Sequence, residues 1–205
     1  MSKTKAQRRT NRQKVKTRNK QKLELKIKNK EQDNINSLME KIVRDVDGEN
    51  ADILKTVSEP YDLDDDTDKL MSQLNVNELR EVLSATKMGV GLAANQIGIA
   101  KQSIVWRVRP ETPIRHMINP EIIETSEDKD SMHEGCLSYP GYFVEVERST
   151  ECTIKFFDEN IVEHTETFKG WEARVIQHEL DHLRGVCLVG ESPEENRTYA
   201  NNMKK

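Results

Sequence analysis

The 205-residue sequence lacks any apolar run that approaches the roughly 20 residues needed to span a bilayer, and no apolar signal core follows its basic start. Cysteine is scarce, with only Cys136, Cys152 and Cys187. An odd number of cysteines in a chain of this length argues against a disulfide framework and for reduced thiols or a metal ligand. These absences predict a cytoplasmic protein without a membrane attachment.

Acidic residues are nearly missing from the start of the chain. Residues 1–30 hold thirteen Lys and Arg against one acid, Glu24, whereas the remainder is acidic, so the net charge of −4 sums two opposed regions. Residues 1–48 are expected to form a basic, largely disordered arm, because its first part has too few apolar residues to offset the entropy of folding. A short amphipathic helix is expected at about 33–47, capped by Asp33 or Asn34 and ended by Gly48.

Residues 49–205 are expected to form one compact domain. A helical pattern covers 67–88, extended patterns cover 103–108 and 116–123, an alternating pattern covers 141–150, and a hairpin is predicted at 151–170. A last helix is predicted over 171–185 and ends at Gly185. The order of helix, strands and helix predicts an α+β fold, with mostly antiparallel sheets packed around a central buried helix.

That last helix contains the stretch HELDH, a match to the HExxH pattern. At 100° per residue, Trp171, Val175, His178 and His182 fall on one stripe, and apolar residues form a second stripe nearly opposite. A helix that is apolar on two faces is mostly buried, so both histidines are expected to face the interior. Buried imidazoles need hydrogen bonds or a metal.

Two histidines one turn apart can each offer a ring nitrogen to a single ion, which explains their spacing. Glu179 lies about 100° around the helix from His178, where it can reach an attacking water rather than serve as a ligand. This is the arrangement of metal-assisted hydrolysis. The same short pattern also arises by chance in charged helices, so by itself it leaves both interpretations open.

A third protein ligand is needed, and downstream candidates are poor. The position at which one class of zinc peptidases has a third histidine is Leu188. Glu191, Glu194 and Glu195 follow in a short polar tail that would hold a ligand poorly. The better candidate is upstream, in HEGCLSYPG, where Cys136 lies between glycines and the backbone amide of Leu137 is free to donate to an oxyanion.

The other two cysteines, Cys152 and Cys187, are interpreted as small buried hydrophobic residues. A third stretch, GVGLAANQIG over 89–98, has glycines that allow a close backbone approach, and Gln96 supplies an amide donor. Alone, this stretch is explained as well by a tight loop that enters a strand.

Together, GVGLAANQ, EGCLS and QHELDHLRG resemble the three motifs of peptide deformylases, in the same order and over roughly residues 52–190. The resemblance implies a deformylase-like catalytic domain that removes the formyl group from the formylmethionine of nascent polypeptides. It implies one divalent metal, natively Fe(II) with Zn, Ni or Co as alternatives, held by Cys136, His178 and His182. It also implies that Glu179 is the catalytic acid and base.

The resemblance further implies that Gln96 and the amide of Leu137 stabilise the oxyanion. The backbone near Val90 and Gly91 resembles the strand that pairs with the peptide, while Trp171 and Val175 are expected to line the methionine pocket. Arg148 is predicted to contact either substrate or a carboxylate such as Glu134, and the sequence leaves both open.

The basic arm is a departure from the family, whose members usually start near the domain. It is interpreted either as a solvated tail or as an electrostatic tether to ribosomal RNA. Two other functions are weighed: a zinc metallopeptidase of another HExxH lineage, and a ribosome- or RNA-binding protein with a retired catalytic fold. The first needs the ligand that Leu188 does not supply, and the second predicts the loss of a ligand or of Glu179.

Overall fold

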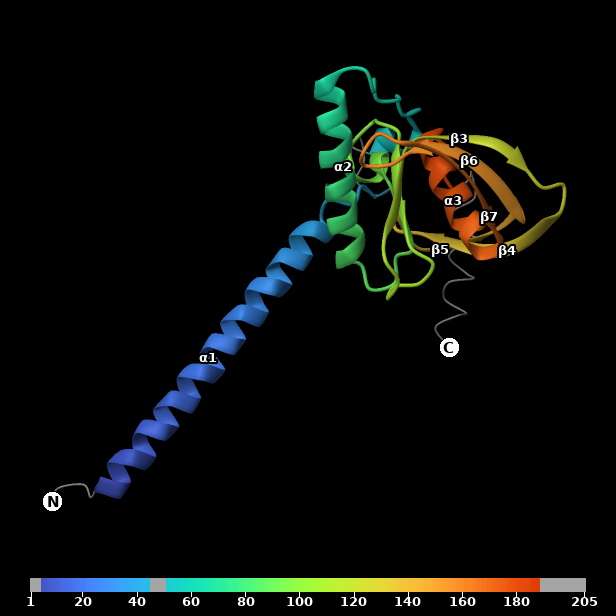
Figure 1. The fold of residues 1–205 in the computed structure, drawn as a ribbon. Helices are drawn as coiled ribbons and strands as arrows, with labels where there is room; N and C mark the ends of the chain where they lie inside the picture. The colour runs from blue at the N-terminus through green and yellow to red at the C-terminus, as the bar shows by residue number, and fades with distance from the viewer. Residues whose placement is uncertain (1–4, 45–50, 189–205) are drawn as a thin grey trace. The chain divides into compact units, whose positions relative to one another are not determined.

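The computed structural model describes residues 5–44 and 51–188, with side chains from residue 20 onward (Figure 1). The chain divides into two units, Met1–Met39 and Glu40–Lys205. The first contains helix α1 (Lys5–Met39). The second contains these elements in chain order: α2 (Asp66–Ala85), β1 (Gly91–Ala93), the 3₁₀ helix η2 (Ala94–Ile97), β2 (Ser103–Trp106), β3 (Arg115–Thr125), β4 (Lys129–Cys136), β5 (Tyr139–Ser149), β6 (Glu151–Phe157), β7 (Glu163–Lys169) and α3 (Gly170–Leu183).

The second unit is built from antiparallel sheets and helices, as expected. Five strands form one sheet in the order β1-β2-β3-β6-β7, while β4 and β5 form a separate two-stranded ribbon. Helix α3 packs against strands of the five-stranded sheet and against β5 of the ribbon. The α+β class is confirmed, and the buried helix with the HExxH sequence lies between the two sheets.

Local sequence explains the main elements of this unit. Asp65 caps α2 by accepting hydrogen bonds from the backbone amides of Thr67 and Asp68. The predicted hairpin is present as β6 and β7, in which Cys152, Ile154 and Phe156 alternate inward along β6. The extended stretch around Pro120 is part of β3, which has a bulge between Ile118 and Glu121. These elements follow the periodicity of the sequence.

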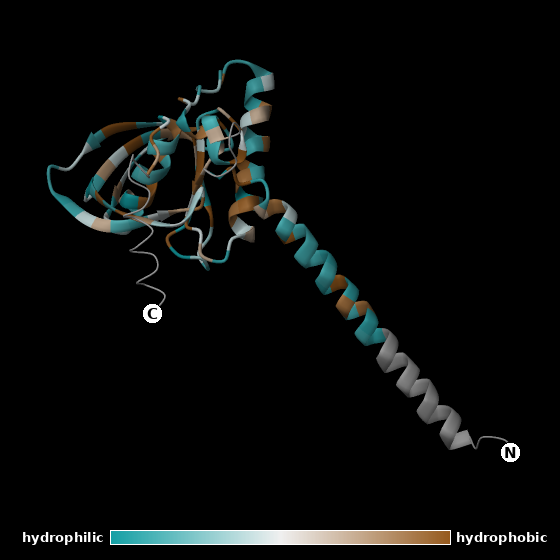
Figure 2. Ribbon diagram, turned by 180° about the vertical axis from the view of Figure 1, so that it is seen from behind, coloured by the Kyte–Doolittle hydropathy of each residue, from teal (hydrophilic) through white to brown (hydrophobic). Residues whose placement is uncertain are grey.

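The main hydrophobic core lies between α3 and the five-stranded sheet. Ile104 and Trp106 of β2, Ile154 of β6 and Ile176 of α3 are fully buried there. The ring of Trp106 meets that of Phe168 edge-on, with centroids 5.8 Å apart. Figure 2 shows the corresponding brown segments in the sheet of this unit. Burial of α3 against this core holds the histidine motif in place.

Helix α1 differs from the expectation of a disordered arm with a short helix at 33–47. It is continuous from Lys5 to Met39. Residues 40–44 of the expected short helix are not helical, and residues 45–47 lie outside the described part. The arm has no proline before Pro60 and no glycine before Gly48, and Lys, Arg, Gln and Glu favour helix without burial. The prediction considered burial as the source of order, whereas intrinsic helix propensity accounts for the helix in the structure, and disorder of the arm in solution stays a prediction. The division between units also falls at Met39 rather than at 48.

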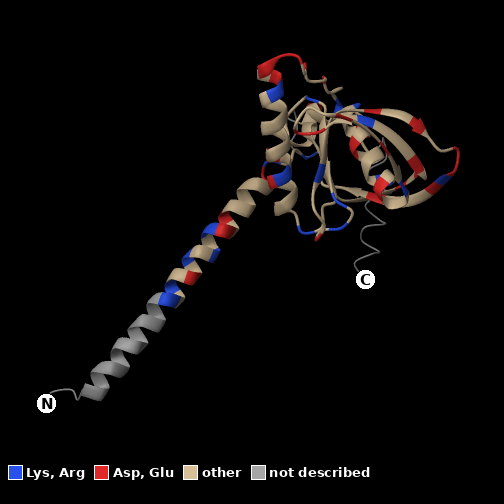
Figure 3. Cartoon of the chain, viewed as in Figure 1, with Lys and Arg blue, Asp and Glu red and all other residues tan. Residues whose placement is uncertain are grey.

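Charge is dense along the described part of α1, where blue and red segments alternate with tan ones (Figure 3). None of the helices in the described part of the chain combines the length and the apolar character needed to cross a membrane.

Candidate metal centre and active site

The structure brings together three potential metal ligands from two elements. Cys136 is the last residue of β4, and His178 and His182 lie one turn apart on α3. One ligand atom from each residue lies within 4.8 Å of the others. The Cys136 Sγ atom is 3.2 Å from His182 Nε2, and the two imidazole rings have centroids 5.1 Å apart. A thiolate and two imidazoles at this separation fit a tetrahedral site for a transition metal, with a fourth position left for a water or substrate.

Helix α3 is buried on more sides than its apolar stripes alone would require. His182 is 1% exposed, and Ile176, Leu180 and Leu183 pack into the main core, as the helical pattern predicts. Arg174 is also buried and hydrogen-bonded rather than solvated. The helix ends as expected, because Gly185 has a φ of +72° and presses against the carbonyl of Lys55, where a Cβ atom would be 2.4 Å from the oxygen.

The two imidazoles are prepared for coordination in different ways. His178 Nδ1 lies 2.9 Å from a carboxylate oxygen of Glu134, which orients the ring and leaves Nε2 for a metal. Burial keeps the pKa of His182 well below its usual value, so that ring stays in the neutral form that a metal requires. Burial lowers the pKa of His178, but hydrogen bonds with Cys136 and Glu134 outweigh burial and raise that pKa to about 10, so a bound metal would have to displace the proton of this ring.

Glu134 is the centre of a buried charge network that sequence reasoning identified only in part. Burial opposes its ionisation, but hydrogen bonds from His178 and Arg148 outweigh burial and lower its pKa to about 2. Arg148 donates through Nε and Nη2 to the two Glu134 oxygens, at 2.7 and 2.9 Å, and through Nη1 to Asp181 at 2.8 Å. Of the two partners that the sequence left open for Arg148, the structure shows the carboxylate. A second arginine, Arg174, donates to Glu134 Oε1 at 2.6 Å, the same oxygen that Arg148 Nε binds.

Glu179 lies beside the three ligands and is 4% exposed. Its Oε2 atom is buried and has no hydrogen-bond partner within residues 20–44 and 51–188. Burial raises its pKa to about 7, against the opposing charges of His178 and Arg148. A buried carboxyl group with a free oxygen and a pKa near neutrality can both accept and return a proton.

Gly91 explains how the carboxyl group of Glu179 fits. A Cβ atom at Gly91 would lie 2.1 Å from Glu179 Oε1, so only glycine leaves room for that group. Gly91 begins the edge strand β1, and the adjacent Val90 is half-buried, with its carbonyl accepting from the Arg107 amide at 2.8 Å. The glycine stretch therefore lies against the carboxyl group of Glu179.

Gln96 and Leu137, the predicted oxyanion donors, flank Cys136. Gln96 is 1% exposed, and its Nε2 donates to Cys136 Sγ at 3.4 Å and to the hydroxyl of Ser138 at 3.1 Å. Its Oε1 accepts from the Ala93 amide at 2.8 Å, which fixes the orientation of the amide group. Leu137 is half-buried in the turn that joins Cys136 to Tyr139.

The residues predicted to line a methionine pocket differ in exposure. Val175 is 5% exposed and belongs to the main core cluster, whereas Trp171 is 43% exposed and donates through Nε1 to the Val108 carbonyl at 3.1 Å. Trp171 therefore lies at the surface of α3 and Val175 beneath it.

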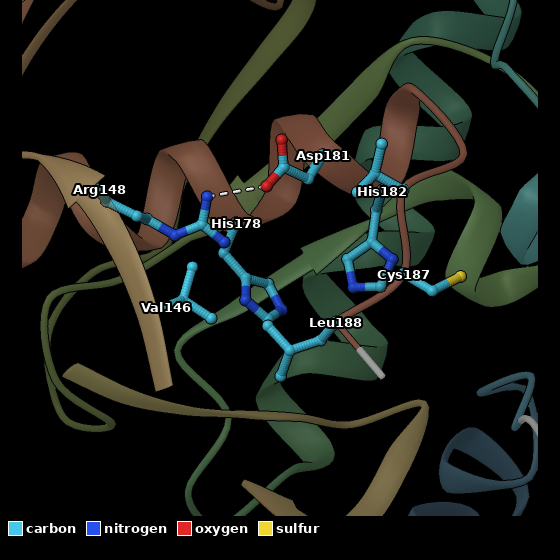
Figure 4. Close-up of a pocket in the computed structure, with 8 residues that line it drawn as sticks. Val146, Arg148, His178, Asp181, His182, Cys187 and Leu188 are labelled. Carbon is cyan, nitrogen blue, oxygen red and sulfur yellow. Dashed lines mark hydrogen bonds and ion pairs between the residues drawn. The ribbon is translucent and has the colours of Figure 1, made fainter. Parts of the chain in front are cut away.

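A cavity of about 130 Å³ borders both histidines (Figure 4). Its walls include Arg148 and Asp181, which are joined by a hydrogen bond in the figure. Leu188, at the position of a third histidine in another class of zinc peptidases, lines the cavity with an apolar side chain. The remaining lining residues are Val146, Val186 and Cys187.

The other candidates from the sequence are not brought to the ligand set. Cys152 is buried in the core, and burial raises the pKa of its thiol to about 11, in keeping with its interpretation as a small hydrophobic residue. Cys187 is half-buried and its thiol donates to the Leu54 carbonyl at 3.4 Å. Glu191, Glu194 and Glu195 lie outside the described residues.

Comparisons with known proteins agree with this geometry. The polypeptide deformylase family matches residues 39–197. The chain is 43% identical over 122 residues to a peptide deformylase from Pseudothermotoga lettingae, and 46% identical over 110 residues to one from Leptospira biflexa. These alignments cover 60% and 49% of this chain, and 69% and 62% of the relatives.

Solved structures give the same result at the level of the fold. The crystal structure of a peptide deformylase from Thermotoga maritima superposes with a TM-score of 0.61 at 34% identity, over 71% of this chain and 91% of that one. A class I type b peptide deformylase from Acinetobacter baumannii, crystallised with Met-Ala-Ser bound, superposes with a TM-score of 0.62 at 30% identity, over 72% of this chain and 94% of that one.

Proposed function

This chain belongs to the polypeptide deformylase family, and on that premise we propose that it hydrolyses the N-formyl group from the formylmethionine of nascent polypeptides. The observation that carries the proposal is the meeting of Cys136, His178 and His182 beside the buried carboxyl group of Glu179. The three thiols are free, and we expect the enzyme to work in the cytoplasm, where thiols remain reduced and nascent chains are made.

The family is metal-dependent, and Cys136, His178 and His182 would hold the ion. We propose Fe(II) as the native metal, with Zn, Ni or Co able to replace it, because a thiolate and two imidazoles suit several divalent transition metals. A bound ion supplies Lewis acidity, which polarises the formyl carbonyl and makes water a better nucleophile. The fit rests on three observations: the spacing of the donor atoms, the neutral ring of His182, and the unpartnered oxygen of Glu179.

The residues around the ligands divide the remaining chemistry among them. Glu179 accepts a proton from the attacking water and passes it to the leaving amine, a role that its pKa of about 7 supports. Gln96 Nε2 and the Leu137 amide donate to the oxygen that becomes negative when the formyl carbon turns tetrahedral. For Gln96 this means leaving its hydrogen bond with Ser138 for one with substrate.

We place the peptide along β1, near Val90 and Gly91, because β1 is the edge strand of the five-stranded sheet. Val175 and Trp171 then contact the methionine side chain from α3, with Trp171 at the more exposed end. The Acinetobacter baumannii enzyme with Met-Ala-Ser bound supports a short peptide as the occupant of this site.

The decisive test is deformylation of formyl-Met-Ala-Ser by protein loaded anaerobically with Fe(II), or with Ni(II). The wild type is expected to release formate, and Glu179→Ala to reduce kcat/KM by roughly 10²- to 10⁴-fold while it still binds metal. Glu172→Ala is the matched control on the same helix, because its carboxylate contacts Trp106 and Arg115 instead of the ligand set. Cleavage of internal peptide bonds without formate release would overturn the proposal.

Neither alternative function fits the site as well. A zinc metallopeptidase of the third-histidine lineage lacks its ligand, since Leu188 is apolar. A retired fold that serves only to bind RNA is expected to lose a ligand or the catalytic carboxylate, and Cys136, His178, His182 and Glu179 are all present.

We further propose that α1 tethers the enzyme to ribosomal RNA near its substrate. The thirteen Lys and Arg of residues 1–30 would displace counterions from RNA phosphates, so binding should weaken steeply with salt. Full-length protein is expected to co-sediment with ribosomes at low salt and much less at moderate salt. Deletion of residues 1–30 is expected to abolish co-sedimentation without changing hydrolysis of formyl-Met-Ala-Ser, and unchanged co-sedimentation would exclude the tether.

A further inference from the structure

Arg174 is a buried charge on α3 that the chemistry above does not use. Its side chain is 3% exposed, although arginine is rarely buried without several partners. It donates through Nη1 to Glu134 Oε1 at 2.6 Å and to the Val146 carbonyl at 3.0 Å, and through Nη2 to the Asp130 carbonyl at 2.8 Å. Nη2 also pairs with the Asp130 carboxylate. Four acceptors surround one guanidinium group.

These acceptors all belong to the β4–β5 ribbon. Asp130 and Glu134 lie on β4 and Val146 on β5, so a single side chain from α3 reaches both strands. The ribbon is not part of the five-stranded sheet, and its position against α3 depends on contacts of this kind.

Arg148 does not duplicate this role. It lies on β5 and binds Glu134 on β4, so its two strongest contacts stay within the ribbon. Its link to α3 is Asp181, whose side chain is 30% exposed and therefore more weakly held. Arg174, by contrast, crosses from helix to ribbon in a buried setting, where charged hydrogen bonds are stronger.

The ligand residues occupy the same two elements. Arg174, His178 and His182 follow one another at four-residue intervals along α3, and Glu134 precedes Cys136 by two residues on β4. The Glu134 carboxylate joins the pair of elements, with Oε1 bound to Arg174 and Oε2 close to His178 Nδ1. Any slip of the ribbon along α3 would move Cys136 away from the two imidazoles.

We propose that Arg174 is a positioning residue that fixes the ribbon against α3 and thereby holds Cys136 within coordinating distance of His178 and His182. The inference rests on the proposed metal site and extends it to a residue that does not touch metal or substrate. Arginine is required rather than any cation, because a lysine ammonium group cannot reach acceptors on both sides as a planar guanidinium does.

The test compares Arg174→Met and Arg174→Lys with wild type, using Co(II) as the probe. Cobalt bound through a thiolate absorbs in the near ultraviolet by charge transfer, so the spectrum reports the Cys136 bond independently of activity. Competition with a chelator gives the Co(II) Kd. Arg174→Met is expected to raise that Kd by about 10- to 100-fold and to weaken the thiolate band, with a smaller increase for Arg174→Lys.

Arg107→Met is the matched control. Arg107 is 6% exposed, and its guanidinium group binds the carbonyls of Gly89, Pro110, Leu83 and Thr86. None of these partners, which lie in the described part of the chain, belongs to the ribbon. This variant is expected to lose stability and to keep the wild-type Kd and thiolate band. An Arg174→Met protein that unfolds at a lower temperature but binds Co(II) with wild-type affinity and a full thiolate band would overturn the proposal.

If Arg174→Met does not fold, Arg174→Lys decides alone: a raised Kd supports the positioning role and a wild-type Kd overturns it. The outcome is separable from the proposed function. A wild type that shows the thiolate band but releases no formate would end the deformylase proposal, and the comparison of Arg174 variants would stand.

Discussion

In helix α3 nine of 14 residues are buried, whereas in helix α1 every described side chain from Lys20 to Ser37 is exposed. The longer helix therefore gains little from packing within its described part. Its order follows from intrinsic propensity over 35 residues, while that of α3 follows from burial in a core. The difference shows that a helix can be specified by composition alone or by its surroundings, and that only the second kind can hold side chains in a fixed catalytic geometry.

The largest difference between the two helices is expected when a proline is introduced into each of them. Gln177→Pro removes a backbone hydrogen bond inside a buried helix and is expected to prevent folding of the second unit. Lys22→Pro has the same chemistry in an exposed helix of the separate first unit, so it is expected to reduce helicity locally and to leave deformylation unchanged. Far-UV circular dichroism and formate release measure the two effects. A loss of activity in Lys22→Pro would show that α1 supports the catalytic unit.

A smaller but still large effect, on kcat/KM, is expected where β1 contacts α3. Gly91→Ala places a methyl group against the Glu179 carboxylate, which must move. A displacement of about 1 Å at a catalytic group lowers kcat/KM roughly 10²-fold, with the metal content unchanged because Gly91 is not a ligand. Steady-state kinetics together with metal analysis test this. Wild-type kcat/KM in the variant would mean that Glu179 need not occupy its present position.

The smallest effect is expected on the free energy of unfolding, when the same isoleucine-to-alanine truncation is made in each of the two helices. Ile176→Ala empties a fully buried site in α3 and is expected to lower the free energy of unfolding by about 2–5 kcal/mol. Ile27→Ala in α1 truncates a side chain that is 50% exposed, and a change within about 0.5 kcal/mol is expected. Urea denaturation of the full-length protein measures the change in the free energy of unfolding for each variant. Equal losses would contradict the contrast between the helices.

The periodicity of the sequence predicted the elements that are buried on one side. Helices α2 and α3 and the β6–β7 hairpin follow directly from spacings of 3.6 and 2 residues. Strand β4 was not identified, because six of its eight residues, including Met132, are exposed and it shows no alternation of apolar residues. Its order comes from pairing with β5, a partner that a local pattern does not reveal.

The residues of the candidate site likewise fall into those that local spacing predicts and those that only the folded structure brings together. The spacing of His178 and His182 and the position of Glu179 could be derived from helical geometry. Cys136 was proposed as the third ligand from its glycine-flanked position, and the resemblance to a family then supported that choice. No local pattern in the sequence predicts a partner for Arg174. Its partner Glu134 is 40 residues away in sequence, and only the packing of the ribbon on α3 brings the two together.

The separation of the ribbon from the five-stranded sheet has a thermodynamic consequence. An ion held by Cys136 and His182 ties together positions 46 residues apart, so it acts on the unfolded chain much as a cross-link of that loop length would. Occupancy of the proposed site would then raise the thermal stability of the protein as well as support its turnover.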